Sequence, residues 1–167
     1  MLNTEKLFLF TDGSVNTKLN FGFGAYLAVN DIEIPAGNLE KVVKVKRFED
    51  TSSTKLEIQT LIWALAESSK LKGKIVLYTD SQNIIGLPDR RERLEKNNYH
   101  SKAGKQITNF ELYKQFFLIL DSLDLEMKKI KGHKRSSTKN NIDRLFTMVD
   151  RASRNALREE NDSTERK

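Results

Sequence analysis

The sequence predicts an α/β fold, a mixed β-sheet with helices packed on it, and three observations support this prediction. β-rich runs come first along the chain, and helix and strand patterns then alternate. Two predicted strands, residues 6–12 and 74–80, are compact apolar runs, as expected of strands buried on both faces. The 167 residues suffice for one domain with a hydrophobic core, which we expect to span residues 1–158.

Local signals predict the remaining elements. Residues 21–30 and 42–48 are β-rich and flank a turn-forming segment, which indicates antiparallel strands. A Thr/Ser-rich cap before apolar residues at helical spacing predicts a helix over 51–70. The later patterns predict a helix over 109–120, a strand over 125–131 and an amphipathic helix ending at about Arg158. Residues 159–167 contain no apolar side chain and are expected to be disordered.

The composition excludes several kinds of site. The chain has no cysteine, so disulfides, thiolate zinc sites and cysteine nucleophiles are excluded. The apolar run within the first ten residues is too short for a signal peptide, and no stretch of the sequence is long enough to span a bilayer. We therefore expect a soluble cytoplasmic protein, without membrane association.

Basic residues outnumber acidic ones, 29 to 23, for a formal net charge of +6. They gather in four groups: Lys41 to Arg47, Arg90 to Lys105, Lys128 to Lys139, and Arg151 to Arg158. A few isolated acidic residues lie between these groups. This interleaving is typical of a protein that holds a polyanion near metal ions.

Two predicted strands end in the same way, at Thr11-Asp12 and at Thr79-Asp80. Sites of open α/β sheets form beyond the carboxyl ends of their strands. If the two strands are parallel neighbours, the two aspartates emerge side by side, and two adjacent carboxylates favour a bound cation between them. A single strand-end Asp is more often a turn former, but a matched pair indicates a metal site.

Glu57 adds a third carboxylate. It lies four residues before Leu61, at the edge of the helix stripe that faces the sheet. A boundary glutamate that reaches solvent is the alternative interpretation. Hard oxygen ligands, with histidine only at 100 and 133, point to Mg²⁺ or Mn²⁺ rather than zinc.

Several motifs in the same order resemble those of the ribonuclease H family, type 1. The matching segments are F-T-D-G-S at 10–14, G-F-G-A-Y-L at 22–27, T-S-S-T-K-L-E at 51–57, Y-T-D-S-Q at 78–82, I-T-N-F-E-L-Y at 107–113 and K-G-H at 131–133. The resemblance covers most of the chain up to about Arg158. It implies an RNase H-like fold with a five-stranded mixed sheet flanked by helices.

The same resemblance implies the activity, which is hydrolysis of the RNA strand of RNA/DNA hybrids. Two Mg²⁺ ions, or Mn²⁺, would activate a water and stabilise the leaving oxygen, giving 5′-phosphate products. The metal ligands would be Asp12, Glu57, Asp80 and an aspartate of the last helix. His133 would assist proton movement or product release. No oligomer interface is evident, so we expect a monomer without an obligatory protein partner.

The fourth acid is either Asp150 or Asp143, which are one heptad apart on the last predicted helix. Asp143 follows His133 at the interval common in the family. Asp150 begins a stretch similar to the family's Asp-x-Leu-Ala-Arg pattern, and the small Ala152 and Ser153 after it would let the helix approach the sheet. We favour Asp150, with Asp143 as its rival.

The resemblance also suggests which residues contact the substrate. They are Ser14, Ser53, Thr54, Ser81, Asn109, Arg90, Arg91, Lys96 and Lys105. The basic segment from Arg90 to Lys105 would grip phosphates of the DNA strand. Ser52, Ser53 and Thr54 stand where the family often has asparagines that contact RNA 2′-hydroxyls, so serine hydroxyls and backbone amides would replace those contacts.

Two alternative functions stay open. A relative with the same fold could process DNA, as junction-resolving and strand-transfer nucleases do. A non-catalytic nucleic-acid-binding module is the other possibility, but loss of function should show first as a missing carboxylate, and every acid position is filled.

Overall fold

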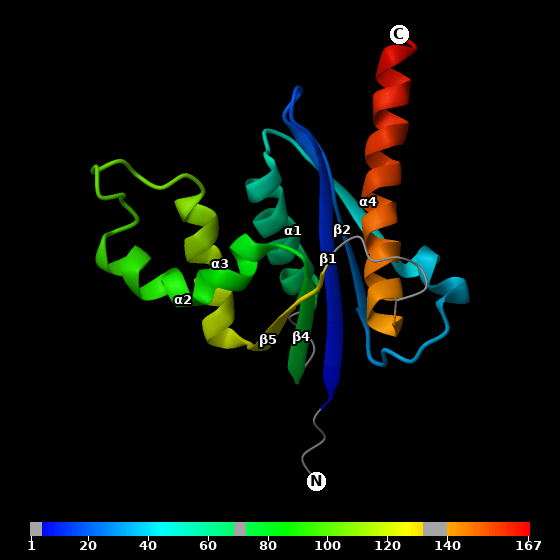
Figure 1. Ribbon diagram of the computed structural model, residues 1–167, viewed down its shortest axis with the longest axis horizontal. Coiled ribbons are helices and arrows are strands. Elements are labelled where there is room, and N and C mark those ends of the chain that lie inside the picture. Colours follow the sequence, from blue (N-terminus) through cyan, green and yellow to red (C-terminus); the bar gives the residue numbers. More distant parts are fainter. Residues whose placement is uncertain (1–4, 69–72, 132–139) are drawn as a thin grey trace.

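A mixed sheet of five strands forms the centre of the computed structural model, which describes residues 5–68, 73–131 and 140–167. The strands are β1 (Lys6–Asn16), β2 (Phe21–Val29), β3 (Lys44–Phe48), β4 (Lys74–Thr79) and β5 (Asp124–Lys129). Their order in the sheet is β3-β2-β1-β4-β5 (Figure 1). β1 runs antiparallel to β2 and parallel to β4, and β4 runs parallel to β5. The predicted fold class is therefore confirmed.

Helices cover both faces of this sheet. They are α1 (Ser53–Ser68), α2 (Gln82–Lys96), α3 (Phe110–Ser122) and α4 (Asn141–Glu165), and the short 3-10 helix η1 (Ala36–Val42) precedes β3. Figure 1 shows α4 on one face and α1 with its neighbours on the other.

Alternation along the strands divides the core into two layers. Leu9 of β1 packs towards α1, α2 and α3, in a cluster that includes Ile58 and Phe116. Phe10, the next residue, packs on the opposite face with Phe146 and Val149 of α4. Successive side chains of a strand point to opposite faces, so the central parts of β1 and β4, residues 7–10 and 75–78, are apolar on both faces. This double burial fixes the strand ends from which the acidic residues emerge.

The structure adds α2, which the sequence patterns do not predict. Pro88 lies inside this helix, where a proline removes a backbone donor and usually kinks or ends a helix. Ser81 caps the helix by accepting a hydrogen bond from the backbone N–H of Ile84 at 3.2 Å. The apolar residues Ile84, Leu87 and Leu94 are buried against the sheet side, and this packing overrides the local preference.

The sequence predicts a disordered tail after residue 158, whereas α4 continues to Glu165 in the structure. Polar contacts rather than apolar burial hold the extension. Asn161 Oδ1 accepts a hydrogen bond from Asn16 Nδ2 of β1 at 3.1 Å, and Glu160 forms an ion pair with Arg47 of β3 at 2.7 Å. A tail without apolar residues is therefore helical where it follows the edge of the sheet.

Candidate active site

Asp12 and Asp80 lie next to each other because β1 and β4 are parallel neighbours. Phe10 of β1 pairs with Tyr78 of β4 in the sheet. Asp12 lies two residues after Phe10, and Asp80 lies two residues after Tyr78. β4 ends at Thr79, so Asp80 lies just beyond that strand, while Asp12 lies within the longer β1. The structure thus confirms the parallel pairing on which the predicted acidic pair depends.

Glu57 reaches the same region from the second turn of α1. Its carboxylate accepts a hydrogen bond from the Ser81 hydroxyl at 2.6 Å, which joins α1 to the loop after β4. Burial raises the pKa of Glu57, and so does the nearby charge of Asp80, whereas the hydrogen bond from Ser81 lowers it. Ser81 therefore holds the Glu57 carboxylate in place and favours its charged form.

Asp150 completes the group from α4. The helix comes close to β1 at this point, where the hydroxyls of Ser14 and the fully buried Ser153 are 3.0 Å apart. The Arg154 Nε donates to an oxygen of Asp150 at 2.9 Å. The small side chain of Ser153 permits the close approach that the sequence predicts after Asp150.

Asp143 lies elsewhere and has a different task. It occupies the first turn of α4, where its backbone N–H donates to the Asn140 side chain at 2.9 Å. Its own carboxylate accepts from the backbone N–H of Asn140 at 3.2 Å. This reciprocal capping satisfies backbone donors at the helix start. Asp143 is buried there, and the pocket described next is lined by Asp150 instead.

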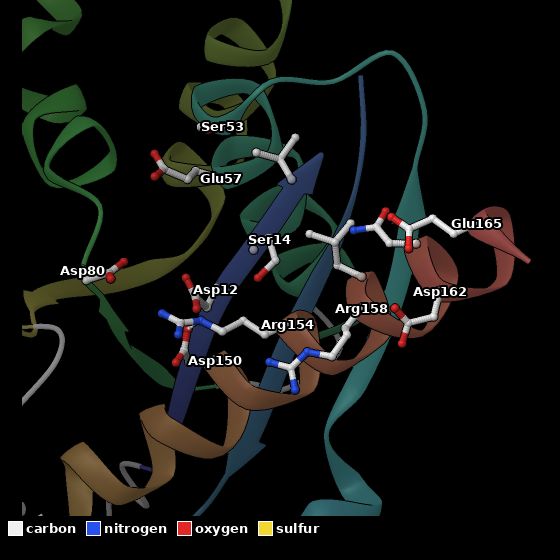
Figure 2. A pocket seen from close by; sticks show the side chains of 14 residues that line it. Asp12, Ser14, Ser53, Glu57, Asp80, Asp150, Arg154, Arg158, Asp162 and Glu165 are labelled. Carbon is white, nitrogen blue, oxygen red and sulfur yellow. Dashed lines mark ion pairs between the residues drawn. The ribbon is translucent and has the colours of Figure 1, made fainter. Parts of the chain in front are cut away.

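The four carboxylates line a single open pocket of about 730 Å³, called the acidic pocket below. Its lining includes Asp12, Glu57, Asp80 and Asp150. Figure 2 shows these side chains arriving from β1, α1, the end of β4 and α4, with the Arg154 guanidinium beside Asp150. Four separate elements of the fold therefore bring negative charge to one place.

The pKa of Asp12 is strongly perturbed in this pocket. Burial, a hydrogen bond with Asp150, and the charges of Asp80 and Asp150 together raise the pKa of Asp12 to about 8. The backbone N–H of Gly13 opposes this effect and lowers the pKa. Near neutral pH the Asp12 carboxyl holds a proton unless a cation offsets the neighbouring charge.

The donor chemistry fits a hard divalent cation. Among the described residues, no three His, Cys, Asp or Glu side chains are placed closely enough to enclose an ion by themselves. Mg²⁺ is usually held by one or two carboxylates, and waters and substrate phosphates complete its octahedron. The contact between Asp12 and Asp150, with Asp80 nearby, supplies such a carboxylate set.

Five of the predicted substrate-binding residues lie around two pockets. Ser14 and Ser53 line the acidic pocket. Thr54, Lys105 and Asn109 line a second pocket, of about 510 Å³, between the start of α1 and the loop before α3. The second pocket lies next to the acidic one along α1, since Ser53 and Thr54 are consecutive residues.

The remaining predicted contacts have other surroundings. Ser81 is buried and caps α2 while it holds Glu57, so it positions an acid and does not face the pocket. Arg90 donates to the backbone and side-chain oxygens of Asn83. Arg91 forms a two-pronged ion pair with Asp121, at 2.6 and 2.9 Å. Lys96 is exposed at the end of α2. Both arginines thus have partners within the chain, and we leave them out of the proposed substrate surface.

His133 lies outside the described residues, within the gap from 132 to 139. Its suggested part in proton movement stays a prediction.

The site residues predicted from the sequence do not include the far wall of the acidic pocket. That wall is formed by α4 residues that follow Asp150: Arg154, Leu157, Arg158, Asn161, Asp162 and Glu165. They share one stripe of the helix with Asp150, at intervals of three or four residues. This spacing is visible in the sequence, but the predicted helix ends at about Arg158 and so does not include the last three of these residues.

Comparisons with known proteins agree on one family. The RNase H family model matches residues 4–158. Ribonuclease H of Neorickettsia sennetsu is 30% identical over 152 residues, which are 90% of this chain and 91% of that protein. Ribonuclease H of Chlorobium phaeobacteroides is 24% identical over 148 residues, which are 87% of this chain and 95% of that protein.

Solved structures show the same fold. The RNase H domain of PFV superposes with a TM-score of 0.68 at 14% identity, covering 90% of this chain and 92% of that one. LC9-RNase H1, described as a type 1 RNase H with the type 2 active-site motif, gives a TM-score of 0.68 at 16% identity, covering 93% and 74%. In the part of the chain that the structure describes, no helix combines the length and apolar character needed to cross a membrane.

Proposed function

This chain belongs to the ribonuclease H family of nucleolytic enzymes, and we propose that it cuts the RNA strand of RNA/DNA hybrids in a reaction that requires divalent metal ions. The observation that carries the proposal is the convergence of Asp12, Glu57, Asp80 and Asp150 on one open pocket. Such a cluster of carboxylates repels a polyanionic substrate unless cations are bound between them.

The four carboxylates would hold two Mg²⁺ or Mn²⁺ ions. When bound, the ions supply Lewis-acid chemistry, activating a water and stabilising the leaving 3′ oxygen so that the product carries a 5′ phosphate. The contact between Asp12 and Asp150 supports shared ligation by this pair. Glu57, held by Ser81 and close enough to Asp80 to feel its charge, would add a further carboxylate to the ligand set.

The chain's own groups orient the substrate around this centre. Ser14 and Ser53 place hydroxyl groups in the acidic pocket. A hydroxyl can donate to or accept from an RNA 2′-hydroxyl, the group that distinguishes RNA from DNA. Thr54, Asn109 and Lys105 line the second pocket, and Lys105 supplies positive charge there for a phosphate of the other strand.

The competing assignment is a DNA-processing nuclease with the same fold. Family membership favours the hybrid substrate. The relatives described above are named ribonuclease H, and this chain matches nearly their whole length. The monomeric state and the cytoplasmic location stay predictions from the sequence.

The test is cleavage of a matched set of duplexes of one sequence: RNA/DNA hybrid, duplex DNA and duplex RNA, each with Mg²⁺, Mn²⁺ or a chelator. We expect metal-dependent cuts in the RNA strand of the hybrid, products with 5′ phosphates, and intact duplex DNA. Asp12→Asn should remove the activity, while the exposed Asp89→Asn serves as a charge-matched control. Preferred cleavage of duplex DNA would replace this proposal with the DNA-processing one.

A further inference from the structure

The far wall of the acidic pocket is a continuous stripe of α4 that begins at Asp150 and extends beyond the four site carboxylates. It contains Asp150, Arg154, Leu157, Arg158, Asn161, Asp162 and Glu165. With a rise of 1.5 Å per residue, the 15 steps from Asp150 to Glu165 span roughly 22 Å. The pocket is therefore an elongated trough, and its last turn lies outside the family match, which ends at residue 158.

This extension of α4 has a defined position relative to the acids. Asn161 is hydrogen-bonded to Asn16 at 3.1 Å, which ties the helix to the end of the same strand that carries Asp12. Glu160 pairs with Arg47 at 2.7 Å and ties the helix to β3. Two strands thus anchor the final turns, so the residues that face the trough keep their positions next to it.

Arg158 is the cation of this wall that is open to a ligand. Arg154, one turn earlier, already donates to Asp150. Arg158 is exposed, faces the trough, and forms no ion pair with any residue that the structure describes. Figure 2 shows the two arginines on successive turns of α4, with Asp162 and Glu165 further along the helix.

We propose that Arg158 binds a backbone phosphate of the nucleic-acid strand that leaves the acidic centre along α4. Arg158 lies eight residues, or roughly 12 Å along the helix axis, beyond Asp150. A strand of duplex advances by that length in roughly three to four nucleotides, so the phosphate is a different one from that at the acids. The inference rests on the proposed function, because it needs a nucleic-acid strand in the trough.

The acidic residues beyond Arg158 limit how far the bound strand follows α4. Asp162 and Glu165 line the same wall one and two turns later. Carboxylates repel a phosphodiester backbone, so the strand should leave the trough after Arg158 and not follow the helix to its end. The wall thus holds one phosphate and turns the strand away from the next.

The test measures hybrid binding in metal-free buffer with a chelator, where cleavage cannot interfere. Fluorescence anisotropy of a labelled hybrid over a series of KCl concentrations gives the slope of log K against log salt. Each neutralised phosphate of a duplex contributes about 0.9 to that slope. Arg158→Gln should reduce the slope by about that amount, and Arg158→Lys should keep it.

Arg151→Gln is the matched control, since Arg151 is exposed on α4 but does not line the trough. Its slope should equal that of the wild type. An unchanged slope in Arg158→Gln, or equal losses in Arg151→Gln and Arg158→Gln, would overturn the proposal.

A second pair of variants tests the acidic end. Asp162→Asn and Glu159→Gln each remove one negative charge from neighbouring positions of the helix, but only Asp162 of these two lines the trough. Asp162→Asn should bind the hybrid more tightly than the wild type, and Glu159→Gln should not. Equal gains from both variants would mean a diffuse charge effect and would count against the trough.

Failure of the proposed function shows separately. If the wild type cuts no hybrid with Mg²⁺ or Mn²⁺ while Arg158→Gln still lowers the salt slope, the phosphate contact stands and the assigned reaction does not. If the wild type cuts the hybrid and the slope is unchanged, the reaction stands and the contact does not.

Discussion

Asp12 is a residue whose ionisation depends strongly on the carboxylates around it. Burial, the hydrogen bond with Asp150 and the charge of Asp80 raise its pKa to about 8, from an ordinary value of 3.8. Without metal, the folded chain therefore keeps a proton on Asp12 at pH values where the unfolded chain has released it. The folded state binds more protons over this range, so the free energy of unfolding falls as the pH rises from about 4 to about 8.

The Asp12→Asn substitution should remove this pH-dependent loss, since asparagine resembles the protonated carboxyl. In metal-free urea unfolding near pH 8, we expect Asp12→Asn to exceed the wild type by up to roughly 5 kcal/mol, because each pKa unit between 3.8 and about 8 corresponds to 1.36 kcal/mol. Near pH 4 the two proteins should be nearly equal. Asp89→Asn should follow the wild type at both pH values. A gain of the same size at both pH values would show that the carboxylates do not repel each other as described.

Asp150 and Asp143 can be separated by opposite effects of similar substitutions. Asp150→Asn removes a charged group of the acidic pocket, so cleavage should fall by several orders of magnitude while the melting temperature changes little. Asp143→Ala removes a cap, so stability should fall by about 1 kcal/mol while cleavage at low temperature persists. Calorimetry and single-turnover cleavage measure the two effects. Loss of cleavage in a folded Asp143→Ala variant would reverse the assignment.

At the scale of elements, the position of Glu57 depends on how closely α1 packs on β2. A Cβ added at Gly24 would lie 2.1 Å from the Thr60 hydroxyl oxygen, closer than any real contact. Thr60 is buried, and its hydroxyl donates to the Leu56 carbonyl at 2.7 Å, so it has little freedom to move away. Glycine at 24 thus sets the distance between the sheet and the helix that carries Glu57.

Gly24→Ala should therefore destabilise the protein by about 1–3 kcal/mol, as overpacked cores do, and should lower the cleavage rate because α1 is displaced. Urea unfolding and single-turnover cleavage are the measurements. Gly37→Ala is the control, because a Cβ there meets nothing within 4 Å. Equal stabilities of the two variants would mean that the contact between α1 and β2 yields without strain.

At the scale of the whole molecule, the sheet and the four acids that line the pocket were predicted from the sequence. Asp12 and Asp80 end apolar runs, and parallel pairing of such strands brings their ends together. Asp150 was preferred over Asp143 because Ser153 permits close packing, and the structure has Ser153 fully buried against β1. Patterns that report burial were sufficient for these residues.

Other features depend on contacts between residues far apart in the sequence, and patterns do not show these. Because of Pro88, the sequence patterns did not predict α2, which is stabilised by burial of Ile84, Leu87 and Leu94. The last turns of α4 form because Asn161 and Glu160 meet Asn16 and Arg47. The sequence does not show which acidic residue, if any, a basic residue will pair with in the fold. Arg91 was therefore predicted to bind substrate, although it forms an ion pair with Asp121.

The most direct test of the whole account is single-turnover cleavage of an RNA/DNA hybrid as Mg²⁺ is raised from zero, with wild type and Asp12→Asn side by side. The account predicts no cleavage without metal, a rate that rises to saturation in the wild type, and cuts in the RNA strand alone. Asp12→Asn should stay inactive at every Mg²⁺ concentration although it is folded. Cleavage by the wild type in the presence of a chelator, or a similar rate in Asp12→Asn, would contradict the claim that the carboxylates of the acidic pocket act by holding metal ions.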